Sequence, residues 1–578
     1  MDKMIHEIEK LKPNSVEKLE TPSKVSAPTR HGKQYVVAID FGTTYSGYAY
    51  QHMSDHVRYP AGGYTQMWQG SNGLSEKTST SLLLTKDGTF EAFGYEAETR
   101  YSELLENNEE EGWKFFKHFK MKIFQEKDLN RDFKIEDDHG TPMPAGIVFG
   151  LSIEFLKQRA FKHIKESDPN MMEENIFYVI TIPAIWCENS RQFMRDAIRI
   201  AGIDDDQAIL AKEPEVAAVY CKEIQLDVQQ ANKRIGRQNH VFNFEQGSKF
   251  VVLDLGGGTT DIAVQEVIDD GRMKILRSAS GGPWGGMTPD KEFEHIIREV
   301  IGMGNNTKFL ERNMGGFYEL LQTWEFKKRV SSDEITSSIN ISVPPEIMEN
   351  ISIPKEEEIV TSKGNVRVLR GKIKIYFETL KSLFNETVQN IVDHLKRMAE
   401  EGTFEDANVM FMVGGFSSSR FIQEAVRDAF PDMTIIVPKN PVLAVLLGAV
   451  AHGFQPNTID ARVSSSHYGI EENGRFVQLI NKGQEIPIGV IVSTYKTRLV
   501  SGKDGFHLKI FASENNIPPR RIGQCRSIGE IFIRMYRAHG KIEKEIEIAI
   551  YFDLTEMKVQ ATDVQTQRNF ITSCNFLN

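Results

Sequence analysis

The chain has 578 residues, which is too long for one compact core and predicts about three to five folding units. Hydrophobic residues make up 40% of it and charged residues 26%, an ordinary globular composition that excludes a wholly disordered or collagen-like chain. Because 80 acidic residues outnumber 69 basic ones, no overall basic field favours nucleic acid as a main partner.

The four cysteines lie far apart, without a CxxC pair or a zinc-like Cys/His cluster, so we expect neither a disulfide scaffold nor a structural zinc site. The N-terminal region lacks the apolar core of a secretory signal. The longest apolar stretch, around 442–451, has about half the length of a membrane span. These features predict a cytoplasmic protein with no membrane span.

Residues 1–33 are rich in Lys, Glu, Ser and Pro and are predicted to form a disordered polar tail. The ordered region begins with an apolar run, 35–39, which is typical of a strand and ends at Asp40. The turn 42–44 (Gly-Thr-Thr) and a second extended stretch, 45–50, follow it. The pattern predicts a strand, a glycine turn and a second strand.

The same pattern recurs in the second half of the chain. A strand over 250–253 ends at Asp254, the turn 256–260 (Gly-Gly-Gly-Thr-Thr) follows, and 262–267 continues as a strand. The repetition predicts that the chain contains two halves with one plan.

Each half also contains a helix with one buried stripe that leads into an apolar strand. The helices lie within 149–164 and 377–395, and the strands are 176–182 and 409–413. Strands that alternate with helices predict an α/β fold with two lobes, 34–240 and 241–454, and a ligand in the crevice between them.

Short segments with alternating apolar residues replace the helical periodicity after Gly453. This alternation is typical of half-buried antiparallel strands, and it predicts a smaller β-sandwich domain over 467–570. Residues 455–466 are then the linker, and 571–578 form a short tail. The linker has only Ile459 and Val463 as apolar residues, so we expect it to dock little apolar surface.

The two glycine turns can bind phosphate, because glycine permits the backbone angles and the close approach that N–H groups need to cradle an anion. Alone, either turn is more often a plain hairpin. As a pair they can clasp one triphosphate, and Asp40 and Asp254 can reach its Mg²⁺ through ordered waters.

The motifs of the chain resemble those of the seventy-kilodalton heat-shock chaperones, which belong to the actin-like ATPase superfamily. In order, they are DFGTTY (40–45), VITIP (179–183) with Arg191-Gln192, Glu213-Pro214, DLGGGTTD (254–261), EFKKRVSS (325–332) and VGG (413–415). The resemblance covers about residues 35 to 570 and is greatest to the divergent class-12 branch. Val442 replaces the usual acidic residue, and we expect no helical lid after the β-sandwich.

The resemblance implies that ATP or ADP binds with Mg²⁺. The first turn contributes phosphate contacts from Gly42, Thr43, Thr44 and Tyr45, and the second from Gly256, Gly257, Gly258 and Thr259. Asp40 and Asp254 hold the water shell of Mg²⁺, Glu213 positions that shell or the attacking water, and Asp261 is a candidate proton acceptor. Without the resemblance, Glu213 could be a surface charge before a helix-breaking proline.

The family also uses a lysine that reaches the γ-phosphate. Lys114, Lys117, Lys120 and Lys122 compete for this role, and Lys120 is the first choice with Lys117 second. The catalytic set implied by the resemblance is therefore Lys120, Glu213, Asp254, Thr259 and Asp261.

The adenosine pocket implied by the resemblance has two walls. The first consists of Glu325, Lys328, Arg329 and Ser332, and the second of Gly414, Gly415 and Phe416. Without the resemblance, the first group could be an exposed basic helix. Phe416 and Ser418 depart from the usual residues, which changes one contact that faces adenine.

These observations predict a monomeric, chaperone-like protein that binds ATP, hydrolyses it slowly, and binds protein clients or signalling partners through its β-rich C-terminal domain. The alternative is a nucleotide-gated scaffold or signalling adaptor with negligible hydrolysis. An actin-like kinase or filament former is a third hypothesis, which the β-rich C-terminus disfavours.

Overall fold

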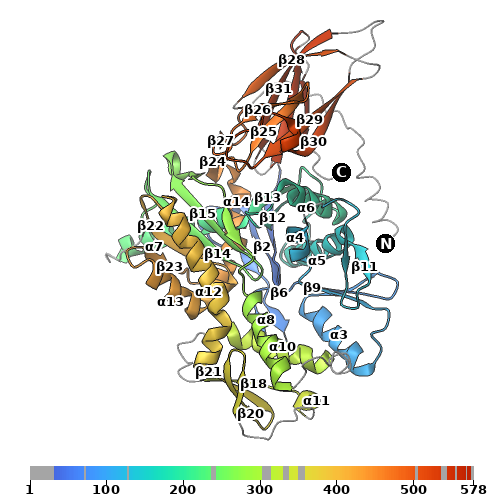
Figure 1. Cartoon of the computed structure of the whole chain (residues 1–578), viewed down its shortest axis with the longest axis vertical. Helices are drawn as coiled ribbons and strands as arrows, with labels where there is room; N and C mark the ends of the chain where they lie inside the picture. Colours follow the sequence, from blue (N-terminus) through green and yellow to red (C-terminus); the bar gives the residue numbers. More distant parts are fainter. Residues whose placement is uncertain are drawn as a thin grey trace.

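The computed structural model (Figure 1) describes residues 32–70, 73–126, 129–235, 242–301, 314–329, 338–348, 358–491, 493–500, 505–534, 543–553, 556–565, 567 and 569–573. Residues 1–31 of the predicted tail 1–33 and the end of the chain after residue 573 lie outside these ranges. Within them, no helix combines the length and the apolar character needed to cross a membrane.

The first sheet has the strand order β13-β12-β1-β2-β3, and β6 pairs with β2. Its strands are β1 (Tyr35–Phe41), β2 (Tyr45–His52), β3 (Tyr64–Thr65), β6 (Thr78–Ser79), β12 (Ile176–Ile182) and β13 (Ala208–Lys212). All seven residues of β1 and of β12 are buried, because helices cover both faces of the sheet.

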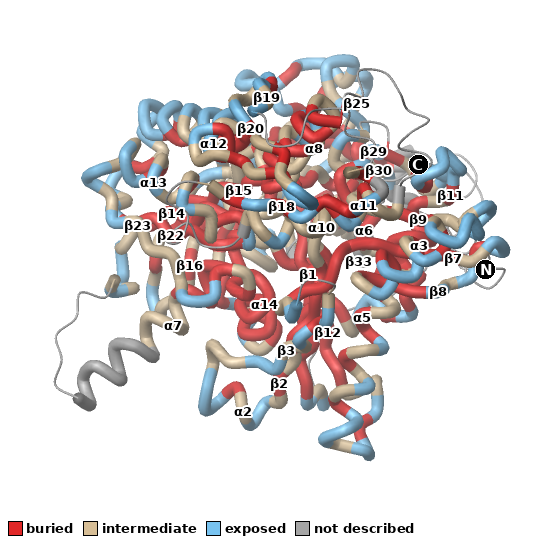
Figure 2. Tube along the Cα trace, turned by 90° about the horizontal axis from the view of Figure 1, so that it is seen from below, coloured by how far each residue is buried: buried red, intermediate tan, exposed pale blue. Residues whose placement is uncertain are grey.

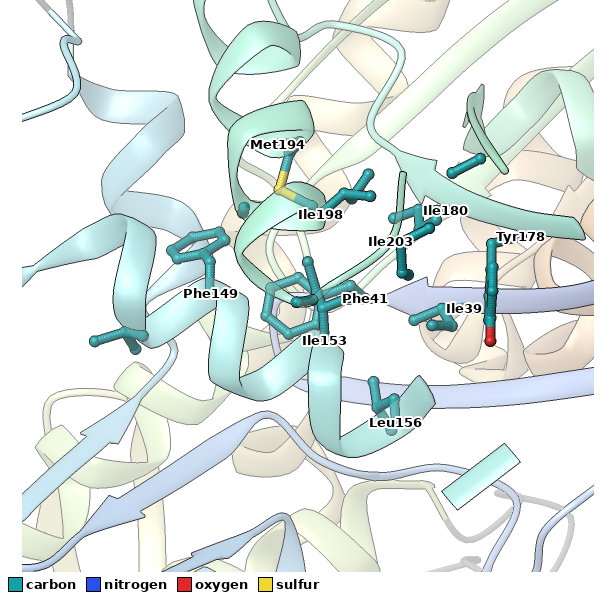
Figure 3. Packing of buried hydrophobic residues seen from close by; sticks show 14 of the residues in the cluster. Ile39, Phe41, Phe149, Ile153, Leu156, Tyr178, Ile180, Met194, Ile198 and Ile203 are labelled. Atoms are coloured by element: carbon teal, nitrogen blue, oxygen red, sulfur yellow. The ribbon is translucent and has the colours of Figure 1, made fainter. Parts of the chain in front are cut away.

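One face of the first sheet packs against α5 (Ala145–Ser167) and α6 (Glu188–Ile200). Figure 3 shows Phe41 of β1 next to Phe149 and Ile153 of α5, with Met194 of α6 in the same cluster. The predicted helix stripe over 149–164 therefore faces the sheet, and this packing fixes the end of β1 from which the glycine turn leaves.

The first half contains further elements around this sheet. They are α2 (Met53–Arg58), β4 (Trp68–Gly70), β5 (Gly73–Ser75), β7 (Ser81–Leu84), β8 (Phe90–Phe93), α3 (Tyr95–Asn107), β9 (Lys114–Lys117), α4 (Lys120–Gln125), β10 (Lys134–Glu136), β11 (Pro142–Pro144), η1 (Glu173–Asn175) and α7 (Glu213–Ile235).

The second sheet repeats the arrangement of the first. β14 (Lys249–Leu255) pairs antiparallel with β15 (Thr260–Val267) and parallel with β22 (Ala407–Val413), just as β1 pairs with β2 and β12. The remaining strands of this sheet are β16 (Met273–Ile275), β17 (Ser280–Gly282), β23 (Thr434–Ile436), β24 (Ile459–Val463) and β27 (Glu485–Pro487). The predicted repetition of strand, turn and strand is present in the structure.

Helices and a small sheet complete this half. They are η2 (Asp269–Gly271), α8 (Met287–Ile301), α10 (Met314–Arg329), β18 (Ser338–Ser342), α11 (Pro345–Met348), β19 (Glu358–Thr361), β20 (Gly364–Leu369), β21 (Lys372–Tyr376), α12 (Phe377–Glu400), η4 (Gly415–Ser418), α13 (Arg420–Ala429), η5 (Pro441–Leu443) and α14 (Ala444–Phe454).

The longest apolar stretch of the sequence forms α14, which is a buried helix. One hydrophobic cluster joins α7 and α14 to residues of both large sheets, such as Ala38 of β1 and Val252 of β14. Figure 2 shows α14, β1 and β12 as buried along most of their length. A helix that is apolar on every side suits this place, because protein surrounds it.

The C-terminal region consists of two four-stranded antiparallel sheets, drawn in red in Figure 1. The first contains β25 (His467–Glu472), β26 (Arg475–Ile480), β29 (Gly505–Ser513) and β30 (Arg526–Arg534), and the second contains β28 (Thr494–Val500), β31 (Glu543–Asp553), β32 (Glu556–Asp563) and β33 (Asn569–Ser573). Ile510, Ile548 and Val559 belong to one cluster between them. The alternating residues of the sequence therefore form strands, as expected.

The segment 455–466 docks more firmly than its sequence suggests. It forms η6 (Pro456–Thr458) and then β24, which pairs parallel with β16 and antiparallel with β27. Ile459 and Ala461 are buried. We expected little docking because the segment has few apolar side chains. In the structure, backbone hydrogen bonds on both edges of β24 hold this segment in the second sheet.

Candidate functional site

A cavity of about 340 Å³ lies where the turn after β1 faces the turn after β14. The side of the first sheet contributes Asp40, Gly42, Thr43, Thr44, Tyr45, Ser75, Lys77, Lys120 and Glu213. The side of the second contributes Asp254, Gly256, Gly257, Gly258, Thr259, Gly286, Glu325, Lys328, Gly414, Gly415, Phe416, Ser418, Ser419, Val442 and Val445. The two turns that are far apart in the sequence thus line one cavity.

The two turns approach each other so closely that glycine is required. A Cβ atom on Gly257 would lie 2.0 Å from Oγ1 of Thr44, and one on Gly258 would lie 2.7 Å from Oγ1 of Thr43. Gly42 carries a similar constraint, since its Cβ would lie 2.1 Å from the carbonyl oxygen of Tyr45. The glycines therefore allow both the turn and its contact with the opposite turn.

Asp40 ends β1 with a buried carboxylate that has two partners. Lys77 Nζ lies 2.5 Å from its Oδ2, and Thr181 Oγ1 donates a hydrogen bond of 2.8 Å to its Oδ1. Burial opposes the charge, but Lys77, Thr181 and the nearby Lys120 outweigh it and hold the pKa of Asp40 below its usual value. Asp40 is therefore ionised at neutral pH.

Asp254 is the corresponding residue of β14, and its surroundings differ. Its side chain is buried, and no hydrogen bond or ion pair reaches its carboxylate from the part of the chain that the structure describes. Burial raises its pKa well above the usual value, and the nearby charges of Glu213, Asp261 and Asp40 raise it further. An unpartnered buried carboxylate that lines a cavity indicates that a donor or cation from a ligand belongs there.

Glu213, whose side chain is 13% exposed, and the buried Asp261 are two further carboxyl groups near the cavity. Glu213 begins α7, and burial raises its pKa to about 7 although Lys120 Nζ lies 3.0 Å from its Oε1. Asp261 Oδ1 accepts a hydrogen bond of 3.0 Å from the backbone N–H of Ile185, and burial raises its pKa. Asp261 lies behind the residues that line the cavity, next to Thr259.

The structure separates the four candidate lysines. Lys120 lies at the start of α4, is almost fully buried, and lines the cavity with its ammonium group at Glu213. Lys117 Nζ pairs instead with Glu98 at 2.9 Å, and Lys114 donates to a backbone carbonyl. Lys122 is exposed. Only Lys120 of the four lines the cavity.

Of the residues predicted for the adenosine pocket, Glu325 and Lys328 lie on α10, and Gly415 and Phe416 lie on η4. Lys328 Nζ lies 2.5 Å from Oε2 of Glu325 and 2.6 Å from Oδ2 of Asp290, and it donates to the carbonyl of Gly286. Burial, together with Glu325, raises the pKa of Asp290 to about 7. The side chain of Arg329 and all of Ser332 lie outside the described residues.

The opposite wall is formed by Gly414, Gly415 and Phe416. Gly414 has a φ of 85°, and a Cβ there would lie 2.5 Å from Oδ1 of Asp254, so its glycine lets the strand end pass close to this carboxylate. A Cβ on Gly415 would meet no atom within 4 Å. Phe416 is largely buried and stacks on Phe384 of α12.

Sequence reasoning missed Lys77, Thr181 and Asp290. Thr181 lies within the VITIP motif, two residues before Pro183, which could have marked it as a strand-end residue. Asp290 follows a glycine-rich segment by four residues. Lys77 carries no local signal, because only the pairing of β6 with β2 brings it to Asp40.

The residues present fit a hydrated magnesium ion with a nucleotide phosphate. Within the described ranges, no three His, Cys, Asp or Glu side chains are grouped to ligate a bare ion. Asp40 and Asp254 nevertheless face one cavity, and Mg²⁺ commonly keeps most of its waters and takes one or two carboxylates. The partnerless carboxylate of Asp254 supports this fit.

Comparisons with known proteins point to one family. The model of the family described as Hsp70 protein matches residues 114–571. Human heat shock 70 kDa protein 12A is 28% identical over an alignment that covers 94% of this chain and 91% of that protein, and the mouse protein of the same name gives the same values. Human heat shock 70 kDa protein 12B is 29% identical over 96% of this chain and 94% of that protein.

Proposed function

Because the chain belongs to the Hsp70 family, in its divergent class-12 branch, we propose that its cavity binds ATP or ADP with Mg²⁺ and hydrolyses ATP slowly. The family match confirms the resemblance that the motifs indicated, and membership of this family implies an ATP-binding, actin-like ATPase domain. In this proposal the two large sheets and their helices are the two lobes. The observation that carries it is the unpartnered carboxylate of Asp254 in a cavity lined by both glycine turns.

The residues of the two turns hold the phosphates. Both turns line the cavity, including Thr43, Thr44 and Thr259, and Lys120 supplies a buried positive charge. Backbone N–H groups and hydroxyls are the donors that such turns offer to phosphate. Bound Mg²⁺ supplies charge neutralisation at the phosphate oxygens. Asp40 and Asp254 orient its water shell.

Glu213 and Asp261 act on water in this proposal. Glu213 orients the water that attacks the γ-phosphorus, because its carboxyl group lies in the cavity and is held by Lys120 at 3.0 Å. Asp261 accepts a proton indirectly through Thr259, since it lies behind the lining residues. The base and ribose lie between Lys328 with Glu325 and the wall 414–416, and Arg329 and Ser332 belong to the same proposed pocket.

The C-terminal sheets supply the partner site in this proposal. A monomeric, chaperone-like protein of the cytoplasm would bind protein clients or signalling partners through these sheets, over about 467–570. The chaperone-like role rests on family membership together with the pairing of β27, which lies within 467–570, with β24 of the second sheet.

Calorimetric titration with ATP and ADP, with and without Mg²⁺, tests the binding. We expect saturable binding of both nucleotides to the whole chain, and Asp254→Asn should lower the rate of phosphate release about 10²–10³-fold. Asp406→Asn is a matched control, since this exposed aspartate pairs with Lys249 away from the cavity. Absence of binding at millimolar ATP, or normal phosphate release by Asp254→Asn, would refute the proposal.

A second candidate is a nucleotide-gated scaffold with negligible hydrolysis. The ion pair between Lys77 and Asp40 favours it, because a protein ammonium group already neutralises a carboxylate that the first candidate assigns to the metal site. ATP binding without phosphate release above background, with or without an unfolded client, would select this candidate.

A further inference from the structure

Lys77 is a buried cation that the family motifs do not assign. It lies between β5 and β6, its side chain is 11% exposed, and it lines the same cavity as the glycine turns. Its Nζ is 2.5 Å from Oδ2 of Asp40. A lysine held this far from water needs a permanent negative partner, and Asp40 provides it.

Lys77 lines the cavity together with both carboxylates assigned to the metal. Its contact is with Asp40, whereas Asp254 lines the same cavity from the second sheet. Of these two carboxylates, Asp40 has described partners and Asp254 has none. The ammonium group therefore already contacts one of the two carboxylates that a hydrated divalent cation would use.

The count of charges shows why this cation matters. Four carboxyl groups lie around the phosphate end of the cavity: the buried ones of Asp40, Asp254 and Asp261, and that of Glu213, which is 13% exposed. Lys77 and Lys120 are the buried lysines whose charges act on them. Phosphates that arrive without a metal ion meet this acidic group directly, so the affinity for them depends on every cation that the protein supplies.

The geometry points to Lys77 as a tethered cation at the metal site: it neutralises Asp40 in the metal-free protein and lowers the dependence of nucleotide binding on Mg²⁺. This inference rests on the proposed nucleotide site. Lysine suits the role because its charge is compact and its four-carbon stem is flexible, so that it can remain on Asp40 or turn toward a phosphate oxygen.

The test compares the affinity for ATP in Mg²⁺ and in EDTA, by calorimetry on the full chain. We expect EDTA to weaken binding to the unaltered protein by less than about tenfold, and to weaken binding to Lys77→Met by at least about a hundredfold. In Mg²⁺ the two proteins should agree within about threefold, because the metal then supplies the charge. Lys77→Arg should behave as the unaltered protein, since it keeps the charge.

Two further measurements make the test specific. Lys157→Met removes a lysine of equal burial, paired with Glu173 away from the cavity, and should leave the dependence on Mg²⁺ unchanged. Without nucleotide, the spin resonance of free Mn²⁺ should show tighter Mn²⁺ binding to Lys77→Met than to the unaltered protein, because the competing ammonium is gone.

The outcomes separate this inference from the proposed function. If EDTA lowers the ATP affinity of the unaltered protein by more than about a hundredfold, the role of Lys77 is refuted while the nucleotide site stands. If no ATP binds under either condition, the nucleotide site itself is refuted. If Lys77→Met does not fold, the comparison of Mg²⁺ with EDTA on the unaltered protein still tests the inference, because the inference requires that protein to bind ATP in EDTA.

Discussion

The ion pair between Arg462 and Glu215 fixes β24 to the body of the protein, and its loss should loosen that strand. Arg462 Nε lies 3.0 Å from Oε1 of Glu215 and Nη2 lies 2.6 Å from Oε2, so the contact is bidentate. The two side chains are 12% and 4% exposed. The perturbation is Arg462→Met, which keeps the length of the side chain and removes its charge.

The expected cost is about 3 kcal/mol, and two lines of reasoning agree on it. Burial opposes the charge of Glu215, but Arg462 and then Lys212 outweigh it and lower its pKa from 4.5 to about 2, which corresponds to about 3 kcal/mol of stabilisation. Breaking a buried pair typically costs about 3–5 kcal/mol. Lys212 remains 3.3 Å from Glu215 after the substitution, so the lower end of this range applies.

The assay is amide hydrogen exchange over 459–463 in the full chain. A loss of about 3 kcal/mol should speed exchange of these amides roughly a hundredfold, because exchange from a locally open state follows the opening free energy. Asp460→Asn is the matched control on the same strand. Its partner Arg272 and Asp460 itself are 40% and 35% exposed, and such a pair contributes at most about 1 kcal/mol.

The pH dependence gives an independent check. The folded pKa of Glu215 lies below its usual value, so its contribution is present above about pH 4.5 and is lost as the pH falls toward 2. The difference between Arg462→Met and the unaltered protein should therefore shrink over that interval. Exchange in Arg462→Met within about fivefold of the unaltered rate at neutral pH would refute the reasoning.

Two other substitutions have definite expected outcomes. Gly257→Ala places a methyl group 2.0 Å from Oγ1 of Thr44, which must push the two turns apart, so calorimetry should show ATP affinity reduced by at least about tenfold. Gly523→Ala, whose methyl group meets no atom, should leave it unchanged, and equal affinities would contradict the packing of the turns. Tyr468→Phe removes the 2.8 Å hydrogen bond to Glu188 and should cost about 1–3 kcal/mol in denaturant unfolding, and an unchanged midpoint would contradict this.

The elements that a short stretch of sequence determines could be predicted from the sequence. Residues 176–182 alone contain the apolar run of β12, and the boundaries agree with the structure. The two glycine turns could also be predicted, because a side chain at position 257 or 258 would collide with the opposite turn. That both turns line one cavity followed from the repetition of strand, turn and strand.

The residues that escaped prediction depend on distant parts of the chain. Lys77 reaches Asp40 only because β6 pairs with the start of β2, and nothing in the residues around Lys77 indicates a buried ammonium. The choice among the lysines of 113–124 was open for the same reason. Lys120 and Lys117 are three residues apart, but β9 ends at Lys117 and α4 begins at Lys120, so they enter different surroundings.

The first turn of α7 connects the cavity with β24. Glu213 and Glu215 are separated only by Pro214, yet Glu213 faces Lys120 in the cavity whereas Glu215 faces Arg462 of β24. Proline fixes its own φ, so this turn has little freedom to move one carboxylate without the other. A change in the charge around Glu213 therefore acts on a backbone segment that also carries the ion pair of β24. The ion pairs of these two glutamates, rather than the apolar residues of 455–466, are thus the contacts that join the cavity to β24.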